Sequence, residues 1–479
     1  MLFNSPEFLL FLPIVFALYW FVVQRNLRAQ NVLLVLASYV FYGWWDWRFL
    51  GLIALSTVVD YLVVLQIEGA QEKRAKQQWL SLSMVVNLGL LCYFKYSNFF
   101  IESWVDAWAA AGVNMQISSL KVILPVGISF YTFQTLSYSI DVYRGNLKPT
   151  RSLINFAAFV SFFPQLVAGP IERATRLLPQ IENRRTFKYE EGVAGLRLIL
   201  WGMFKKVVVA DTCAIYANDI FANCTDYSGP TLMLGAVYFA FQIYGDFSGY
   251  SDIAIGTAKL FGIELMTNFK TPYFSRDIAE FWRRWHISLS TWFRDYLYIP
   301  LGGSRVGKWK SVRNVFVIFL VSGFWHGANW TFIAWGGIHA CLFIPLLLRG
   351  TNRRFATKTI AKNRWLPNVR ELLGMAWTFT MVCIAWVFFR AESVGEATAY
   401  LSKIGSIRDW LYPSQSLSFR AFAFLGAMVV GDWLMRNGRM PAWWQTSNML
   451  PIRWGFASLG GWFILKNFAS QADFIYFQF

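Results

Sequence analysis

Residues 312–329 run VRNVFVIFLVSGFWHGAN, and after one tryptophan residues 331–348 run TFIAWGGIHACLFIPLLL. Both stretches are predominantly apolar and have the length that a helix needs to cross a bilayer, about 20 residues. Each nevertheless carries an imidazole, His326 in the first and His339 in the second, although the chain has only three histidines. Because an ionisable group at membrane depth is costly, it indicates a reactive site or a pathway by default. Imidazole is also well suited to moving protons near neutral pH.

The composition of the whole chain is that of a membrane protein. Of its 479 residues, 56% are hydrophobic and 15% are charged, whereas soluble proteins have about 25% charged residues. Apolar stretches of bilayer length recur from end to end, without a soluble domain or a repeat period. We therefore predict an all-α polytopic membrane protein with one integral-membrane domain, residues 1–479. The first apolar stretch lacks a basic n-region and a cleavage site, so we expect it to be a retained span.

The net charge of +17 and the five cysteines exclude some functions. The basic residues lie in short loops between apolar stretches, where the positive-inside rule places them. They do not form a binding stripe, so nucleic acid is not an expected partner. The cysteines lie far apart or in apolar segments, which indicates neither a metal site nor a disulfide framework.

Basic loops alternate with non-basic loops along the chain. This alternation predicts about twelve crossings with both termini outside, near 8–23, 31–45, 49–66, 79–96, 122–140, 191–215, 230–247, 312–329, 331–348, 371–389, 419–435 and 453–468. The stretch 153–170 is basic on both flanks and contains Pro164 and Pro170, which disfavour helix. We therefore expect it to re-enter on the cytoplasmic side. Residues 250–310 are too polar for a simple crossing and are predicted to form a cytoplasmic excursion with interfacial helices.

Two of the three histidines lie in dense motifs, His286 in RRWHISLS and His326 in FWHG. If the excursion folds back, both rings can face one internal cavity, one as general base and the other as hydrogen-bonding support. A purely structural role is the alternative for each, and for His326 the flanking Gly323 and Gly327 suit close helix packing. His339 has no charged neighbours and is the weakest candidate.

Carboxylates and arginines near these motifs are further candidates. Asp246 and Asp252 follow a predicted span, so they are expected at its cytoplasmic mouth, either as helix caps or in the active site. Four basic residues can hold the phosphates of an anionic donor or contact lipid headgroups: Arg276, Arg283, Arg284 and Arg294.

Taken together, these motifs resemble the membrane-bound O-acyltransferase family. The resemblance rests on YGDFSGYSD from 244, FWRRWHISLSTWFRDYLYIPLGG from 281 and FWHGANW from 324. LPVGISFYTFQ at 124–134 and FPQLVAGPI at 163–171 agree, and the similarity extends over nearly the whole chain. The sequence looks most like the bacterial branch that O-acetylates alginate and peptidoglycan. Teichoic acid D-alanyl transfer is a more distant likeness.

The resemblance implies a ring of helices around a tunnel, in which a cytoplasmic thioester donor meets an acceptor from the other face. It implies catalysis by His326 with His286 as its polar companion, and acetyl-CoA or another acetyl thioester as donor, with no permanently bound cofactor. It also implies the bacterial inner membrane as location, with periplasmic termini. The acetyl group is expected to pass to a periplasmic acetyltransferase or acetyl-carrier protein, and through it to a polysaccharide.

Two other interpretations stay open at this point. A transporter that moves an acetyl-bearing molecule without bond chemistry would also need many spans and a buried histidine, although the inverted repeat typical of transporters is not visible. A lipid, protein or teichoic-acid acyltransferase of the same fold would differ only in its acceptor.

Overall fold

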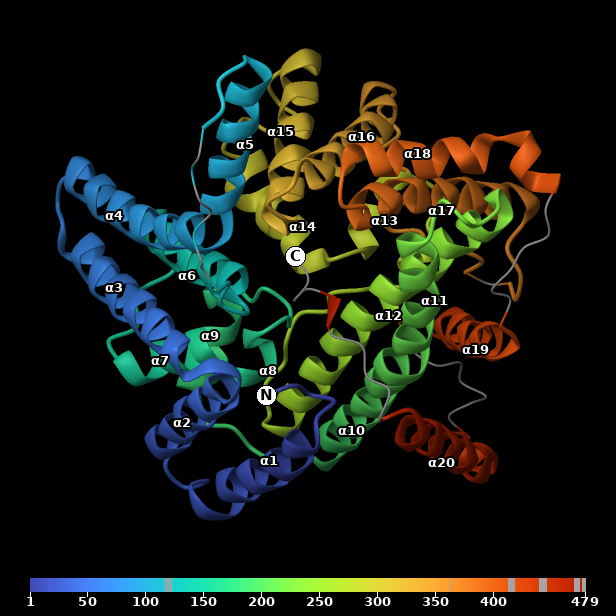
Figure 1. Cartoon of the computed structure of the whole chain (residues 1–479). Helices are drawn as coiled ribbons and strands as arrows, with labels where there is room; N and C mark the ends of the chain where they lie inside the picture. Colours follow the sequence, from blue (N-terminus) through green and yellow to red (C-terminus); the bar gives the residue numbers. More distant parts are fainter. Residues whose placement is uncertain are drawn as a thin grey trace. The chain divides into compact units, whose positions relative to one another are not determined.

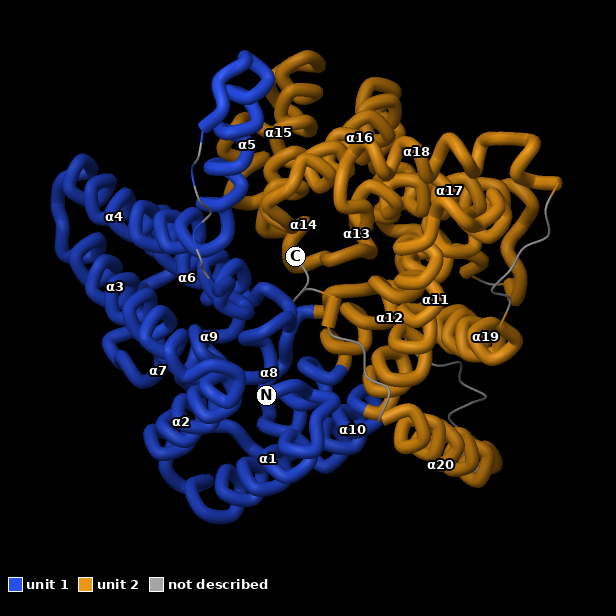
Figure 2. Tube along the Cα trace, in the orientation of Figure 1, with its two compact units in different colours: residues 1–199, 253–266 blue, residues 200–252, 267–479 orange. Residues whose placement is uncertain are grey.

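The computed structural model describes residues 1–115, 117, 120, 123–362, 364–411, 418–438, 446–468 and 474–475. Every regular element in these ranges is a helix (Figure 1), which confirms the predicted all-α class. The chain separates into two compact units (Figure 2). Unit 1 holds residues 1–199 and 253–266, and unit 2 holds residues 200–252 and 267–479. The single integral-membrane domain stays a prediction.

Unit 1 contains the helices of the N-terminal part of the chain. They are α1 (Pro6–Ala17), α2 (Leu27–Asp46), α3 (Leu50–Gly69), α4 (Lys73–Leu91), α5 (Ser97–Ala110), α6 (Ile128–Tyr143), α7 (Leu153–Ser161), α8 (Phe163–Leu166), α9 (Ala174–Glu182) and most of α10 (Tyr189–Met203). The last turns of α12 (Gly229–Leu260) complete the unit.

The core of unit 1 is built around α6, most of whose residues are buried. This helix packs against α3 and α4, and a polar cluster ties the three together. The buried Asp60 carboxylate on α3 accepts hydrogen bonds from Ser83 and Asn87 on α4 and from Ser139 on α6. The Asn87 amide lies 2.8 Å from Asp60 and the Ser139 hydroxyl 3.2 Å. Polar side chains join apolar helices in this way because they have no water to bind.

Four helical segments in the described part of the chain are long and apolar enough to cross a membrane. They are Leu27–Gly69, Lys73–Ala110, Trp330–Leu348 and Val369–Arg390, and the shorter Pro6–Val22 is also apolar. A multi-pass membrane protein is therefore supported, while the count of about twelve crossings stays a prediction.

Helix ends differ from several predicted boundaries. The stretch 153–170 is interrupted as expected, at Phe162 between α7 and α8, but Pro164 lies in the first turn of α8 rather than ending a helix. The excursion was predicted to begin at residue 250, which is too early, because α12 continues to Leu260. The polar residues near 250 had suggested water, but their side chains find partners inside the protein. Re-entry of 153–170 itself stays a prediction.

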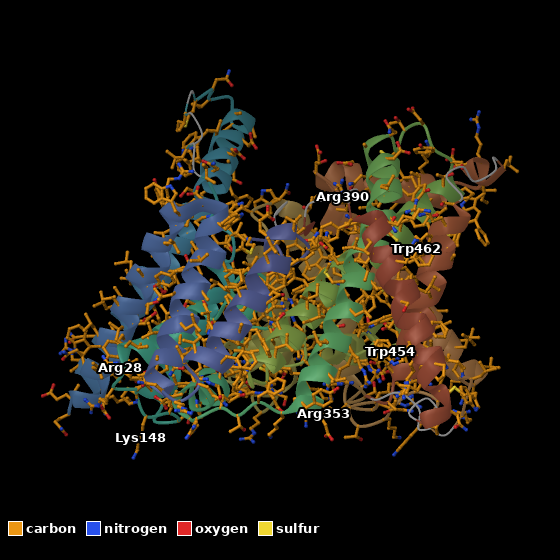
Figure 3. The ribbon with its side chains drawn as sticks, turned by 90° about the horizontal axis from the view of Figure 1, so that it is seen from below. Arg28, Lys148, Arg353, Arg390, Trp454 and Trp462 are labelled. Atoms are coloured by element: carbon orange, nitrogen blue, oxygen red, sulfur yellow. The ribbon has the colours of Figure 1, made fainter. Side chains whose placement is uncertain are left out.

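Basic side chains gather at helix ends. In Figure 3, Arg28 and Lys148 lie toward the same end of unit 1, as expected for two loops on one side of the membrane. Within unit 2, Arg353 lies at the opposite end from Arg390, the last residue of α17 (Val369–Arg390). Both observations agree with the alternation of basic loops. The assignment of these sides to cytoplasm and periplasm stays a prediction.

Unit 2 begins with the last turn of α10. A π-helical segment, Phe204–Ala210, then links α10 to α11 (Asp211–Ala222). The unit includes most of α12 and then α13 (Ile278–Arg284), α14 (Ile287–Phe293), α15 (Lys308–His326), α16 (Trp330–Leu348), α17, α18 (Val394–Gly405), α19 (Phe419–Met435) and α20 (Leu450–Asn467). A second π-helical segment, Arg294–Tyr298, extends α14.

The hairpin of α15 and α16 is held by a close backbone contact. A Cβ atom on Gly323 would lie 2.2 Å from the Phe332 carbonyl oxygen, and one on Gly336 would lie 2.3 Å from that of Phe319. Only glycine fits at these two positions, one on each helix. Small residues permit such an approach between membrane helices, where dispersion replaces the hydrophobic effect as the attraction.

We expect Gly336→Ala to destabilise the protein, because the added methyl group must push the two helix backbones apart. Overpacking of this kind costs about 1–3 kcal/mol, and thermal unfolding in detergent measures it as a lower midpoint. Gly337→Ala is the matched control, since its Cβ would meet nothing closer than Leu320 Cδ2 at 3.9 Å. Equal midpoints for the two variants would show that the contact is not tight.

Candidate functional site

His286 lies between α13 and α14, at a bend where the backbone is left-handed. Its φ is 43° and its ψ is 55°, a conformation uncommon for residues other than glycine. The side chain is fully buried, and neither ring nitrogen has a hydrogen-bond partner among the described residues. Burial lowers the pKa of His286 to about 3. The imidazole is therefore neutral at neutral pH.

Aromatic rings surround His286. Its ring centroid lies 4.6 Å from that of Phe247 on α12, 6.4 Å from Phe269 and 5.8 Å from Trp325 on α15. These contacts give the imidazole a firm position without giving it a charge partner.

His326 is the last residue of α15 and is buried. Gly327 follows it, and a Cβ atom there would lie 2.0 Å from the Phe332 ring. The turn into α16 therefore needs a glycine directly after His326. The centroid of the His326 ring lies 4.9 Å from that of Trp325, 5.1 Å from Trp335 and 5.4 Å from Phe389.

The structure brings His286 and His326 together, with ring centroids 6.2 Å apart. This proximity was expected from the sequence, since both motifs were predicted to face one interior. Two imidazoles at this separation, in apolar surroundings, can act on one reacting group. Which of them is the base, and whether either is catalytic, stays a prediction.

His339 occupies a different position from the other two. It lies on α16, and its Nδ1 accepts a hydrogen bond from Trp282 Nε1 at 3.3 Å. Trp335 lies between His339 and His326, with its ring centroid 4.9 Å from that of His339 and 5.1 Å from that of His326. His339 therefore lies behind Trp335, outside the pair formed by His286 and His326, and its low ranking as a catalytic candidate stays a prediction.

Asp246 and Asp252 are not helix caps, because both lie within α12. Asp246 is buried and Asp252 is mostly buried. Neither side chain lies at the open cytoplasmic end of a span, where both were expected. The Lys206 ammonium lies 2.8 Å from Asp246, and the Lys205 ammonium 2.5 Å from Asp252. The other Asp246 oxygen accepts the Ile475 backbone N–H at 2.6 Å. These ion pairs were not predicted, because the lysines are about 40 residues away from the aspartates, in the π-helical segment Phe204–Ala210.

Two of the candidate arginines are engaged in ion pairs with one carboxylate. Arg276 and Arg284 reach Glu280 Oε1 at 2.9 Å and 2.7 Å, and Arg276 also reaches Glu371 at 3.4 Å. Their side chains are mostly buried. They are therefore held by the protein itself.

The other two candidate arginines differ in exposure. Arg294 is largely exposed and pairs with its neighbour Asp295 at 2.7 Å. Arg283 is partly buried, and its Nη1 donates to the Asn352 carbonyl at 2.8 Å. Its Nη2 is buried and has no partner among the described residues. Arg283 thus keeps a donor available for a ligand.

Several residues of the site were not singled out from the sequence. Trp335, Phe389 and Phe269 form its aromatic walls, and Asn268 binds the backbone next to His286. In a chain with 19% aromatic residues, a single ring carries little signal. Trp335 precedes His339 by four residues and so shares its helix face, which is the one sign the sequence offers.

Comparison with known proteins places this arrangement in a family. A sequence model of the membrane-bound O-acyltransferase family matches residues 39–388, a range that includes both clustered histidines. A probable alginate O-acetylase of Azotobacter vinelandii is 43% identical over 436 residues, which cover 90% of this chain and 84% of that protein. A peptidoglycan O-acetyltransferase of Helicobacter pylori is 38% identical over 433 residues, covering 84% of this chain and 79% of that protein.

A teichoic acid D-alanyltransferase of Bacillus subtilis is more distant, at 29% identity over 289 residues, which cover 56% of this chain and 69% of that protein. The family match extends over more than half of the sequence, and the helical architecture agrees with it. The chain therefore belongs to the membrane-bound O-acyltransferase family and is an O-acyltransferase of the membrane.

Proposed function

We propose that this protein transfers an acetyl group from a cytoplasmic thioester donor toward a cell-surface polysaccharide, with His326 as the general base. The observation that carries the proposal is the pair of buried imidazoles with ring centroids 6.2 Å apart. Each comes from one of the motifs that carry the family resemblance. Alginate and peptidoglycan, which the names of the similar proteins mention, define the class of acceptor.

The reaction needs few groups. The neutral His326 imidazole takes the proton of an acceptor hydroxyl, and the hydroxyl oxygen attacks the thioester carbonyl carbon. The tetrahedral oxyanion collapses, the carbon–sulfur bond breaks, and the leaving thiolate receives the proton from the imidazolium. His286 stays neutral because of its burial and supports the base without competing for its proton. Aromatic walls that exclude water protect the thioester from hydrolysis.

Arg283 is the best candidate for contact with phosphates of the donor, which we expect to be acetyl-CoA or another acetyl thioester. Its buried Nη2 has no partner among the described residues, and a guanidinium matches phosphate geometry well. Arg284 already neutralises Glu280. Arg294 and Asp246 were candidates as well, but each has an ionic partner within the chain.

The alternation of basic loops supports the orientation that we propose in the membrane. We place the protein in the bacterial inner membrane with periplasmic termini and basic loops in the cytoplasm. The acetyl group then leaves on the periplasmic side, to an acetyltransferase or acetyl carrier that modifies the polysaccharide. The lipid bilayer is the constant partner, and nucleic acid is not one.

Family membership disfavours the transporter interpretation, and one experiment separates the two. Purified protein in liposomes receives radiolabelled acetyl-CoA on one side. Transfer gives free thiol together with label bound to protein, lipid or added polysaccharide. Appearance of intact donor in the opposite compartment, without free thiol, would instead establish transport. Label recovered only in lipid or protein would favour an acyltransferase with that acceptor.

We expect His326→Gln to lower the rate of acetyl transfer by about 100-fold or more, since general-base catalysis contributes about 10²–10⁴-fold. Glutamine preserves most of the volume and polarity but cannot take a proton. The rate of thiol release by purified protein measures the effect, with thermal unfolding as a check on folding.

The matched control for that variant is His339→Asn, which replaces a neighbouring buried histidine. Its side-chain oxygen can still accept the hydrogen bond of Trp282 Nε1, so we expect a rate within a few-fold of wild type. A folded His326→Gln protein with the wild-type rate would refute the base assignment.

We expect Arg283→Ala to raise KM for acetyl-CoA about tenfold or more, because hydrogen bonds to charged groups contribute about 1.5–3 kcal/mol. The value of kcat should change little, because Arg283 does not contact the histidine rings. Arg294→Ala serves as the control, since this exposed side chain pairs only with the neighbouring Asp295 among the charges described around it. A larger KM effect at Arg294 than at Arg283 would reverse the assignment.

A further inference from the structure

We propose that Asn268 is a positioning residue for the transfer reaction, because it clamps the backbone around His286 and so fixes its ring beside His326. The inference rests on the proposed function, in which these two histidines carry the chemistry. Asn268 itself touches no reacting group. Its effect passes through the conformation of the next chain segment.

The need for a clamp comes from the backbone of His286. For a residue with a side chain, the left-handed region is strained relative to ordinary backbone, so this conformation persists only where its surroundings enforce it. The His286 ring cannot supply that restraint by hydrogen bonding, since neither nitrogen has a partner among the described residues. The restraint must come from the neighbouring backbone and from ring packing.

Asn268 supplies the restraint on the C-terminal side of His286. Its backbone carbonyl accepts the Ile287 N–H at 2.9 Å. Its side-chain oxygen accepts the Ser288 N–H at 3.3 Å and the Ser288 hydroxyl at 3.0 Å. The two residues that follow His286 are thus both held by one asparagine. Asn268 and Ser288 are fully buried, where water cannot compete for these bonds.

The clamp is anchored on the long helix α12. The Asn268 amide group donates to the Ser251 hydroxyl at 3.2 Å. Ser251 follows Phe247 by four residues on α12, so the two share one helix face. The Phe247 ring packs against His286, with ring centroids 4.6 Å apart. One asparagine therefore joins the backbone beside His286 to the helix that packs against its ring.

The backbone that precedes His286 is also held, at Arg284. The Lys270 N–H donates to the Arg284 carbonyl at 2.9 Å. Between these two anchors, Phe269 lies against both Trp285 and His286, with ring centroids 5.0 Å and 6.4 Å away. Residues 268–270 thus form a short brace beside residues 284–288. Within this brace, Asn268 holds the segment after His286 through side-chain hydrogen bonds, which a substitution can remove without removing a ring.

Asn268→Ala tests the proposal. It removes the hydrogen bonds to Ser288 and Ser251 but retains the backbone bond to Ile287. Displacement of a catalytic group by about 1 Å can cost on the order of 100-fold in rate, so we expect kcat to fall by about tenfold or more. KM for acetyl-CoA should stay within a few-fold. Asn268→Asp keeps the acceptor oxygen for Ser288, and we expect it to recover part of the lost kcat.

A double variant distinguishes positioning from general stability. If Asn268 acts through His286, then Asn268→Ala should cause no further loss of kcat in a His286→Ala background. The structural control is Asn314→Ala. Asn314 is also fully buried in unit 2, and its amide donates to the Leu301 and Gly303 carbonyls, both at 3.1 Å. We expect that variant to lower the unfolding midpoint while its effect on kcat, where any occurs, adds to that of His286→Ala.

Three outcomes would overturn the inference: wild-type kcat in Asn268→Ala, a loss that adds fully to that of His286→Ala, or a loss confined to KM. If Asn268→Ala does not fold, the milder Ser251→Ala decides by the same criteria. It should lower kcat to a smaller extent and without additivity. His326→Gln in the same assay separates the two proposals, since a wild-type rate there refutes the base assignment. Loss of activity in that variant with normal kcat in Asn268→Ala refutes only the positioning role.

Discussion

Polar groups in the interior of this protein have to be satisfied by the chain itself, because apolar and aromatic side chains exclude water. An unpaired amide or hydroxyl in such a place costs several kcal/mol, and an unpaired charge costs more. The chain meets this constraint with polar partners on neighbouring helical segments, as at Asp60 in unit 1 and at Asp246 and Asp252 in unit 2. The helices of each unit are consequently tied together by a few hydrogen bonds or ion pairs. These bonds fix which faces of otherwise uniformly apolar helices meet.

His286 departs from that pattern, and the departure is informative. The His286 ring has no hydrogen-bond partner among the described residues, although it lies deep in unit 2. The chain accepts this cost together with a left-handed backbone at the same residue. Local strain and an unsatisfied polar group tend to coincide where a ligand or a reaction uses them. A purely structural ring at this place would be served equally well by phenylalanine, without the polar nitrogens.

The sequence was sufficient for the fold class and for the identity of the two central histidines. Recurrent apolar stretches of bilayer length predict helices, and a rare imidazole in such a stretch stands out by itself. The sequence could not predict which side chains pair with one another in the folded protein. Asp252 looked like the start of a water-exposed loop because a carboxylate in isolation implies water. Only the fold shows that Lys205, from another helix, neutralises it, and that α12 therefore continues to Leu260.

The same reasoning explains why the arginines could not be ranked beforehand. In the motif around His286, Arg283 and Arg284 are neighbours of one chemical type, but successive residues on a helix point about 100° apart. Arg284 turns toward Glu280, four residues earlier on α13, and becomes part of the scaffold. Arg283 faces the Asn352 carbonyl, which satisfies one of its terminal nitrogens and leaves the other available. In this basic motif, Arg284 therefore has a structural role, and Arg283 keeps a donor for a ligand. This difference is set by a single glutamate rather than by the arginines themselves.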